Sequence, residues 1–252
     1  MDKPVIDIKG LSVSYDQKRV LSNIYLKVES GFTYGLIGPN GAGKSTLFKS
    51  ILGIIEPNSG EITIMGKDIS KNRKIIAYVP QKDDVDWDFP ATVRDVVMMG
   101  RYPHKKLLQR LNKDDHRITN DAMDQLGIID LADRQIGTLS GGQQQRVFIA
   151  RSVCQEAEIF LMDEPFVGVD MTTEHKIVEI MQDLAEKDKT IMVVHHDLGT
   201  ADDYFDRVIL LNQRLIAYGD MDQVFTRENI GRTYAPQMKI LQDIGLIDAR
   251  NR

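Results

Sequence analysis

The sequence has one cysteine, Cys154, and lacks long apolar runs. One cysteine cannot form an internal disulfide, which fits a chain kept in a reducing compartment. The longest apolar stretches, such as Val208–Leu211, are far shorter than the roughly 20 residues that span a bilayer. The first residues, Met1–Pro4, lack the apolar core of a secretory signal. We therefore expect a cytoplasmic chain in which any membrane step falls to another protein.

The chain also lacks an excess of positive charge. Its net charge is −5 over 252 residues, and neither sign gathers in a long block. Because a nucleic-acid-binding domain usually carries a basic face, we expect no nucleic acid partner. Hydrophobic residues make up 42% and aromatic residues 7%, which is typical of a globular protein with a sizeable core.

Short β patterns alternate with helical patterns along the chain, which predicts an α/β fold with a parallel sheet between helices. Residues 81–137 depart from this alternation, because helical segments at 92–99 and 113–126 indicate an inserted helical lobe. Strands are expected at 5–8, 11–15, 20–28, 32–37, 61–65, 74–79, 159–162, 190–194, 207–211 and 214–219. Other helices are expected from residue 44, at 140–156, 171–186 and 198–204, and over about the last thirty residues.

A glycine-rich segment joins the expected strand 32–37 to the helix that begins at Lys44. It fits the P-loop pattern G-x-x-x-x-G-K-[ST]. Glycines let backbone N–H groups turn inward around phosphates, and the helix points the positive end of its dipole at the same anion. We predict that Lys44 contacts the β- and γ-phosphates of ATP and that Ser45 ligates Mg²⁺. The predicted ATP-binding residues here are Gly38, Pro39, Asn40, Gly41, Ala42, Gly43, Lys44, Ser45 and Thr46.

Two carboxylates end the apolar run Ile159–Met162. A buried strand of an open α/β sheet brings such residues to its carboxyl end, where ligands bind. We predict that Asp163 holds Mg²⁺ together with Ser45 and that Glu164 polarises the attacking water as a general base. The alternative is a strand that ends in a solvated acidic turn, and the upstream P-loop disfavours it.

A second helix start with the features of an anion site lies at Ser140–Gln143. Ser140 is a favourable N-cap, and Gly141 and Gly142 allow a ligand to approach the backbone closely. A single ATP site does not obviously need two such helix starts from one chain. The simplest explanation is that Ser140–Gln143 serves the γ-phosphate of an ATP bound by another subunit, which predicts a homodimer.

These three segments resemble the nucleotide-binding domains of ABC transporters, and the resemblance extends over nearly the whole chain. It implies a P-loop NTPase fold with a RecA-like core, an N-terminal antiparallel β subdomain and an inserted helical subdomain. We expect one domain, residues 1–252, with the helical subdomain at residues 82–137. The implied cofactors are ATP and Mg²⁺.

The resemblance also implies roles for single residues. Tyr15 would stack on adenine, and Gln81 would lie between the Mg²⁺ site and the helical lobe, contributing to both Mg²⁺ binding and catalysis. Leu139–Gln143 would be the signature loop that acts on the ATP of the partner subunit. Asp170 would contact that subunit, and His196 would contact the γ-phosphate as a catalytic residue.

Two of these assignments have plainer alternatives. Tyr15 alternates with Val13 and could be an ordinary strand aromatic. His195 and His196 are neighbours on an expected strand, so their side chains point to opposite faces and only one can contact the nucleotide. The resemblance selects His196, and the role of His195 stays open.

Residues 81–102, 163–170 and 194–200 resemble the ATPases of manganese, zinc and iron importers. This branch implies an integral membrane permease as partner and, indirectly, an extracytoplasmic metal-binding protein. The chain would then be peripheral, on the cytoplasmic side of the cell membrane. Its histidines lack ligand spacing apart from His195–His196, so we expect the metal to pass through the permease. The rival is a cytoplasmic ABC ATPase that moves no solute, such as one of iron–sulfur cluster assembly.

The segment Val85–Pro90 follows Gln81 and places Trp87 and Phe89 among acidic residues. Aromatic residues with a polar rim are typical of an interface anchor. We expect both rings to contact a cytoplasmic helix of the permease. The alternative, in which both rings fold back onto the helical lobe, stays open.

Overall fold

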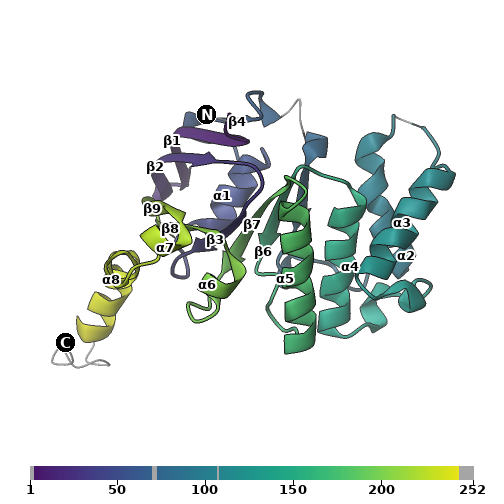
Figure 1. Cartoon of the computed structure of the whole chain (residues 1–252). Helices are drawn as coiled ribbons and strands as arrows, with labels where there is room; N and C mark the ends of the chain where they lie inside the picture. Colours follow the sequence, from purple (N-terminus) through teal and green to yellow (C-terminus); the bar gives the residue numbers. More distant parts are fainter. Residues whose placement is uncertain (1–2, 70–72, 107, 244–252) are drawn as a thin grey trace. The chain divides into compact units, whose positions relative to one another are not determined.

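The computed structural model describes residues 3–69, 73–106 and 108–243, which form two compact units (Figure 1). Unit 1 comprises the described residues of 1–29, 33–69 and 194–252, and unit 2 comprises 30–32 and the described residues of 70–193. The strands are β1 Ile6–Tyr15, β2 Lys18–Val28, β3 Thr33–Ile37, β4 Ser59–Ile64, β5 Ile76–Val79, β6 Ile159–Asp163, β7 Thr190–His195, β8 Arg207–Asn212 and β9 Arg214–Asp220. The α-helices are α1 Lys44–Ile51, α2 Val93–Met98, α3 Lys113–Gln125, α4 Gly141–Cys154, α5 Met171–Ala185, α6 Ala201–Tyr204, α7 Met221–Val224 and α8 Arg227–Asp243. Short 3₁₀ helices lie at Arg73–Ile75, Lys82–Asp84, Met99–His104, Ile129–Leu131 and Ile136–Thr138.

Unit 1 contains a three-stranded antiparallel sheet in the order β2-β1-β4. The expectation of separate strands at residues 5–8 and 11–15 is wrong, because β1 runs through both. Gly10, with φ of 66°, lies at a shift of register in β1 and lets the strand continue past an irregularity. A Cβ on Gly60 would lie 2.5 Å from the carbonyl carbon of Gly10, so β4 passes too close for a larger residue.

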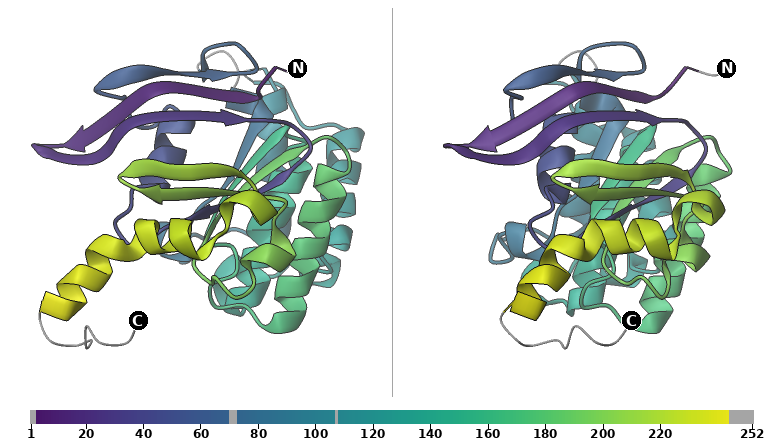
Figure 2. Two further views of the ribbon diagram at one scale, coloured as in Figure 1. Left: turned by 60° about the vertical axis from the view of Figure 1, so that its left-hand side comes forward. Right: turned by 90° about the vertical axis from the view of Figure 1, so that its left-hand side faces the viewer.

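Unit 1 also contains β3 paired in parallel with β8, and β8 paired antiparallel with β9. All five residues of β3 are buried, which explains its continuous apolar sequence. The helix α8 packs along the β8–β9 hairpin (Figure 2). The predicted C-terminal helix is confirmed as far as Asp243, and residues 244–252 lie outside the described residues.

In unit 2, β5 pairs in parallel with β6. The helices α2, α3 and α4 pack against one another (Figure 1), which confirms the helical segments predicted near 92–99 and 113–126. Their contact surfaces include Val97, Met123 and Val147, each 0% exposed. Each such buried side chain stabilises the fold by about 1.5–3 kcal/mol, so apolar packing holds this group of helices together.

Side-chain caps fix where the helices α2 to α5 begin. The side chains of Thr92, Asn112 and Ser140 each accept a hydrogen bond from the backbone N–H three residues later. The side chain at that later position accepts one from the backbone N–H of the cap residue. Asp170 accepts a bond from the Thr173 N–H at the start of α5. Each cap contributes about 1 kcal/mol and places a helix start at a defined residue.

Candidate functional site

The glycine-rich loop of unit 1 joins the buried strand β3 to α1. A Cβ on Gly38 would lie 1.9 Å from the carbonyl oxygen of Leu211, and a Cβ on Gly43 would lie 2.6 Å from Leu21 Cδ2. Gly43 also has φ of 95°, and Gly41 has φ of 78° with no atom within 4 Å of its added Cβ. Close packing and backbone conformation therefore require glycine at these positions, and the loop encloses a fixed shape.

Lys44 lies at the base of this loop, at the start of α1. It is 6% exposed, and its Nζ donates to the carbonyl oxygens of Gly38 at 2.7 Å and Pro39 at 3.0 Å. The N-cap is Gly43, so no side chain in the described chain caps α1, in contrast to α2 through α5. An N-terminus without a side-chain acceptor, next to a buried ammonium group, fits the phosphates of a nucleotide.

Backbone hydrogen bonds support the loop from the β8–β9 turn. The N–H of Gln213 donates to the Ala42 carbonyl at 2.8 Å, and the N–H of Ala42 donates to the Pro39 carbonyl at 3.1 Å. Ser45 and Thr46 follow on α1 and are half-buried, whereas Asn40 is exposed. The predicted phosphate residues thus form one continuous, internally bonded segment.

Tyr15 is the last residue of β1 and is 47% exposed, whereas Val13 is 1% exposed. Residues two apart on a strand share a face, so both side chains start toward the same side of the sheet. At the strand end, however, the Tyr15 ring leaves the core. An exposed ring is accessible to a nucleotide base, and stacking on adenine stays a prediction.

The two neighbouring histidines differ in environment, in agreement with the prediction from strand alternation. His195 ends β7 and is 5% exposed, whereas His196 is exposed. His195 Nε2 lies 3.0 Å from Thr200 Oγ1, and its ring packs against Phe205 with centroids 5.3 Å apart. Burial lowers the pKa of His195, and the charge of Asp197 opposes that shift. The buried imidazole holds the following segment in place. The side chain of His196 is exposed, and its contact with the γ-phosphate stays a prediction.

Two carboxylates lie at the carboxyl end of β6 in unit 2, as the sequence predicts, with Asp163 as its last residue and Glu164 directly after it. Asp163 is 0% exposed, and Glu164 is half-buried. Glu164 has φ of 55°, a left-handed backbone that is uncommon and unfavourable for any residue other than glycine. Strain of this kind recurs at functional positions because it aims a side chain in a direction that a regular backbone does not give. No sequence signal predicts it.

Gln81 lies two residues beyond β5 and is half-buried at the N-cap of the 3₁₀ helix Lys82–Asp84. Because β5 and β6 are parallel neighbours with Val79 opposite Met162, Gln81 and Asp163 leave the sheet at the same edge. The structure therefore brings these two predicted residues to one end of unit 2.

Tyr78 belongs to the same edge, although its sequence context does not single it out. Burial raises the pKa of its hydroxyl, and the neighbouring carboxylates of Asp163 and Asp84 raise it further. The phenol therefore stays protonated and is a hydrogen-bond donor beside the carboxylates. An aromatic residue in an apolar strand is too common to have indicated this placement.

The predicted N-cap of α4 is confirmed. Ser140 Oγ accepts from the N–H of Gln143 at 3.4 Å, and Gln143 Oε1 accepts from the N–H of Ser140 at 3.0 Å. A Cβ on Gly141 would lie 2.9 Å from Lys82 Nζ, and a Cβ on Gly142 would lie 3.7 Å from Asp170 Oδ2. The start of α4 therefore lies between a cationic and an anionic side chain of its own unit.

Asp170 has an observed structural role at the start of α5. Its two carboxylate oxygens accept from the Thr173 N–H and hydroxyl, each at 2.9 Å. Hydrogen bonds from the backbone and side chain of Thr173 lower the pKa of Asp170. The carboxylate is exposed and ionised, and its contact with a partner subunit stays a prediction.

The two aromatic residues of Val85–Pro90 have different environments, and contact of either ring with a partner stays a prediction. Trp87 folds back onto the helical lobe, as the alternative expects. Its Nε1 donates to the Lys82 carbonyl at 2.9 Å, and its ring packs edge-on against Phe148 of α4 with centroids 5.3 Å apart. Phe89 is 54% exposed. Together with Pro90, Met98, Tyr102, Leu111 and other residues of the helical lobe, Phe89 lines a groove of about 400 Å³.

Comparison with known proteins decides the family. The sequence profile described as "ABC transporter" matches residues 21–167. The chain is 51% identical over 238 residues to the manganese transport system ATP-binding protein MntB of Bacillus subtilis (strain 168), an alignment that covers 94% of this chain and 95% of that protein. This chain belongs to the ABC transporter family. As an ABC ATPase it binds and hydrolyses ATP.

Other ABC proteins agree with this assignment. The zinc transport system ATP-binding protein TroB of Treponema pallidum (strain Nichols) is 47% identical over 91% of this chain and 86% of its own length. The structure of CbiO1 from Clostridium perfringens, part of the ABC transporter complex CbiONQ, matches with a TM-score of 0.76 at 27% identity, covering 98% of this chain and 100% of that one. The P-loop NTPase fold predicted from the sequence is thereby confirmed.

The predicted site residues of this ABC subunit divide between the two units. Tyr15, Gly38–Thr46 and His196 lie in unit 1, whereas Gln81, Ser140–Gln143, Asp163, Glu164 and Asp170 lie in unit 2. In the part of the chain that the structure describes, no helix combines the length and the apolar character that a bilayer crossing requires.

Proposed function

We propose that this chain is the ATP-hydrolysing subunit of an importer for a divalent transition metal, with manganese as the first candidate and zinc or iron as the others. One observation carries the proposal, namely the 51% identity to a manganese transport ATPase over 94% of the chain. The 47% identity to a zinc transport ATPase supports the metal class and keeps zinc as a candidate.

Mg²⁺ is the proposed second cofactor, with Ser45, Gln81 and Asp163 as its protein ligands. Held by these residues, the ion would supply positive charge that stabilises the negative charge developing on the phosphates during hydrolysis. Asp163 suits such a ligand because it is 0% exposed, and a buried carboxylate is stabilised by a cation. Oxygen ligands of this type are those that Mg²⁺ prefers.

Glu164 is the proposed general base, which would accept a proton from the attacking water. Its left-handed backbone sets it apart from Asp163, although the two are adjacent in sequence. Lys44 would bind the phosphates, His196 would contact the γ-phosphate, and Tyr15 would stack on the base. These residues would bind and orient the nucleotide. Water would then attack the γ-phosphorus as its proton passes to the Glu164 carboxylate, and the bond from the γ-phosphorus to the β-phosphate oxygen would break to release ADP and phosphate.

We further propose that two copies form a homodimer with ATP between them. In it, Gly38–Thr46 of one copy and Ser140–Gln143 of the other contact the same ATP, and Asp170 contacts the partner subunit. The side-chain cap of α4 supports this division, since its satisfied start offers a ligand only backbone N–H groups and a helix dipole. Hydrolysis would then require closure of the dimer.

The groove beside Phe89 is the proposed docking site for a cytoplasmic helix of the permease. Phe89 and Tyr102 are 54% and 57% exposed, and they line the groove together with Met98 and Met99. Two exposed aromatic side chains beside less accessible methionines on a concave surface suit an apolar helix face. The chain would be held at the cytoplasmic face of the membrane through this contact, and an extracytoplasmic metal-binding protein would act indirectly.

Uptake in cells tests the transport assignment. A strain lacking this chain is grown with a metal chelator, and manganese, zinc and iron are restored one at a time. We expect uptake of radioactive manganese to fall in the deletion strain, to return with the wild-type chain and to stay low with Glu164→Gln. Unchanged uptake of all three metals in the deletion strain would overturn the proposal.

The rival function, a cytoplasmic ABC ATPase of iron–sulfur cluster assembly, makes a different prediction. Such a protein would co-purify with soluble partners from the cytoplasm. We expect an affinity-tagged chain to bring down an integral membrane permease from detergent-solubilised native membranes, and Phe89→Asp to lose it. Retrieval of soluble assembly proteins alone would favour the rival.

A further inference from the structure

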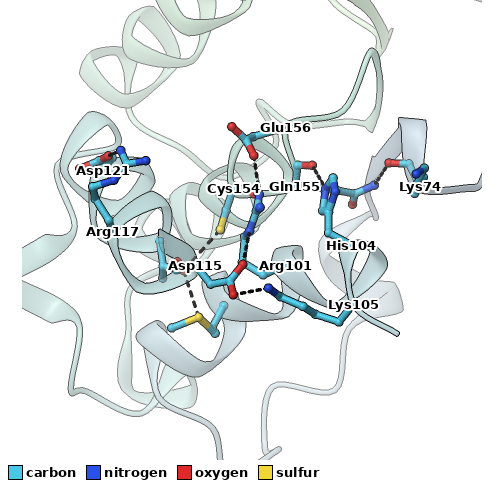
Figure 3. Close-up of polar contacts among 12 residues, drawn as sticks. Lys74, Arg101, His104, Lys105, Asp115, Arg117, Asp121, Cys154, Gln155 and Glu156 are labelled. Carbon is cyan, nitrogen blue, oxygen red and sulfur yellow. Dashed lines mark hydrogen bonds and ion pairs between the residues drawn. The ribbon is translucent and has the colours of Figure 1, made fainter. Parts of the chain in front are cut away.

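The segment Met99–His104 lies against the C-terminal end of α4 (Figure 3). A Cβ on Gly100 would lie 2.3 Å from the carbonyl oxygen of Arg151 and 3.0 Å from the backbone nitrogen of Gln155. Only glycine allows the two backbones to approach this closely. The contact of this segment with α4 therefore requires glycine at position 100.

Arg101 links the Met99–His104 segment to three residues, Cys154, Glu156 and Asp115. It is 7% exposed, and its Nη1 donates to the Cys154 carbonyl at 2.7 Å and to Glu156 Oε2 at 2.7 Å (Figure 3). Its Nε donates to Asp115 Oδ1 at 3.2 Å, on the first turn of α3. The last carbonyls of a helix lack partners within the helix, and the guanidinium group satisfies one of them at the end of α4.

Asp115 completes a buried charge cluster. It is 2% exposed and forms ion pairs with Arg101 and Lys105. Burial alone would raise its pKa, but hydrogen bonds from Lys105, the backbone N–H of Asn112 and Arg101 lower that pKa to about 2. The carboxylate is therefore ionised at neutral pH and holds both cations in one geometry.

His104, one turn after Arg101, forms a second contact with the end of α4. Residues three apart in a 3₁₀ helix share a face, and His104 Nε2 lies 2.7 Å from the Gln155 carbonyl oxygen. Because a carbonyl only accepts, Nε2 carries the proton in this contact. Gln155 Nε2 in turn donates to the carbonyl of Lys74 at 3.1 Å (Figure 3) and to that of Ile76 at 2.8 Å. The end of α4 is thereby tied to β5 as well.

Tyr102, between these two anchors, is exposed and lines the groove with Phe89. One short helix thus contributes to the groove through Tyr102 and to the end of α4 through Arg101 and His104. The helix α4 has 14 residues, about 21 Å at 1.5 Å per residue, and it is a rigid element whose other end is Ser140–Gln143.

We propose that Arg101 and His104 are positioning residues that transmit docking of the permease in the groove to the Ser140–Gln143 end of α4. The inference rests on the proposed function of the groove. Apolar contacts would hold the segment as firmly, because a buried ion pair is on balance weakly stabilising. Directional hydrogen bonds to the Cys154 and Gln155 carbonyls add a fixed orientation that apolar packing does not give. A rotation of the Met99–His104 segment must therefore move the end of α4.

The test uses the complex of this chain with the permease that co-purifies from native membranes, reconstituted in lipid nanodiscs. We measure ATPase activity of the isolated chain and of the complex, and we take their ratio as permease stimulation. Arg101→Met and His104→Phe are expected to lower that ratio by about 3- to 30-fold, the range that coupling networks carry. The KM for ATP of the isolated chain and co-purification of the permease should stay at wild-type levels.

Two further variants separate coupling from general stability. His104→Gln keeps an N–H donor near the position of Nε2 and should restore stimulation. Arg117→Met removes an exposed ion pair with Asp121 on α3, 3.1 Å long, and should change nothing (Figure 3). The His104 pair serves as the test if Arg101→Met does not fold.

The outcomes distinguish the two proposals. If the wild-type chain brings down no permease, or Phe89→Asp assembles normally, the proposed docking site fails. If the complexes assemble and both Arg101→Met and His104→Phe keep wild-type stimulation, the proposed positioning role of Arg101 and His104 fails. It also fails if the isolated variants lose melting temperature and basal ATPase in step, since Arg101 and His104 would then merely stabilise the lobe.

Discussion

The N-termini of α1 and α4 are both candidates for phosphate contact, and they are built differently. At α1 the cap residue is Gly43, the loop before it is shaped by three glycines, and Lys44 is buried at its base. At α4 the Ser140–Gln143 capping box serves the N–H groups of Ser140 and Gln143, and the loop is more exposed. The first start has no side-chain cap, whereas side chains satisfy two N–H groups of the second.

This difference indicates separate tasks for the two helix starts. A pocket with fixed shape and an embedded cation binds a nucleotide without help, because its donors are already oriented. A capped, exposed helix start adds little affinity and contributes only when a phosphate is brought to it. On the proposed function, nucleotide binding by unit 1 and completion of the reaction by unit 2 should therefore be separable by mutation.

The largest expected effect concerns turnover rather than binding. Glu164→Gln should keep ATP affinity and reduce hydrolysis by about 10²–10⁴-fold, the contribution of a positioned general base. The measurement is ATPase rate and ATP affinity of the purified variant, with size-exclusion chromatography to detect an ATP-bound dimer. Near-normal hydrolysis would remove Glu164 from the mechanism.

A smaller effect is expected at α1. Lys44→Ala should weaken ATP binding by the isolated chain by about 100-fold, because charge-assisted hydrogen bonds to phosphate contribute about 1.5–3 kcal/mol. Fluorescent ATP titration measures it, and Lys49→Ala, on the same helix, is the matched control. Equal affinities for Lys44→Ala and wild type would contradict the proposal that the start of α1, unlike that of α4, binds the nucleotide in the isolated chain.

At α4 the expected outcome is the reverse. Ser140→Arg should leave ATP affinity of the isolated chain within about twofold of wild type and block hydrolysis, because its side chain obstructs closure of the dimer on the γ-phosphate. Ser140→Ala is the control, which loses the cap and about 1 kcal/mol of stability without the obstruction. A matching loss of affinity in Ser140→Arg and Lys44→Ala would mean that α4 acts on the ATP of its own chain.

Stability should separate the two aromatic residues that precede α2. Trp87→Ala removes the contact with Phe148 of α4 and should cost about 2 kcal/mol, since the ring is only half-buried. That corresponds to a melting temperature lower by about 4–8 °C. Phe89→Ala, at an exposed site, should melt within about 1–2 °C of wild type. Equal melting temperatures would place Trp87 outside the core of the lobe.

The smallest effect is a pH dependence in unit 1. Burial lowers the pKa of His195 below its ordinary value of about 6.5, so the folded state favours the neutral ring. As the pH falls below about 6.5 the unfolded chain binds a proton first, and folding stability declines. Urea unfolding at pH 7.5 and pH 5.5 should show a smaller loss in His195→Gln than in wild type. An identical loss in both would show that His195 does not contribute to acid sensitivity.

The helix starts were predictable because they depend on local rules. Glycine spacing located Gly38–Thr46, and a serine before two glycines located the cap at Ser140. The continuity of β1 was not predictable, since the close approach of Gly60 to Gly10 joins segments far apart in sequence. The different fates of Trp87 and Phe89 likewise depend on Phe148, a partner that no local pattern indicates.

The contacts of Arg101 and His104 were not predictable either. The resemblance to importer ATPases covers residues 81–102, but the contacts with Cys154, Gln155 and Glu156 follow only from packing of α4 against the Met99–His104 segment. The backbone of Glu164 is a further case, because its φ of 55° is imposed by tertiary structure.

The β8–β9 turn has a consequence for protein engineering. Gln213 is exposed at a hairpin turn, the type of position at which tags, insertions and new termini are usually tolerated. Its backbone nevertheless links two elements, since its N–H donates to Ala42 and its carbonyl accepts from Ser22, each at 2.8 Å. A fluorescent-protein fusion or circular permutation placed there would remove the brace beneath the glycine-rich loop. Reporter insertions in this chain belong at other surface turns.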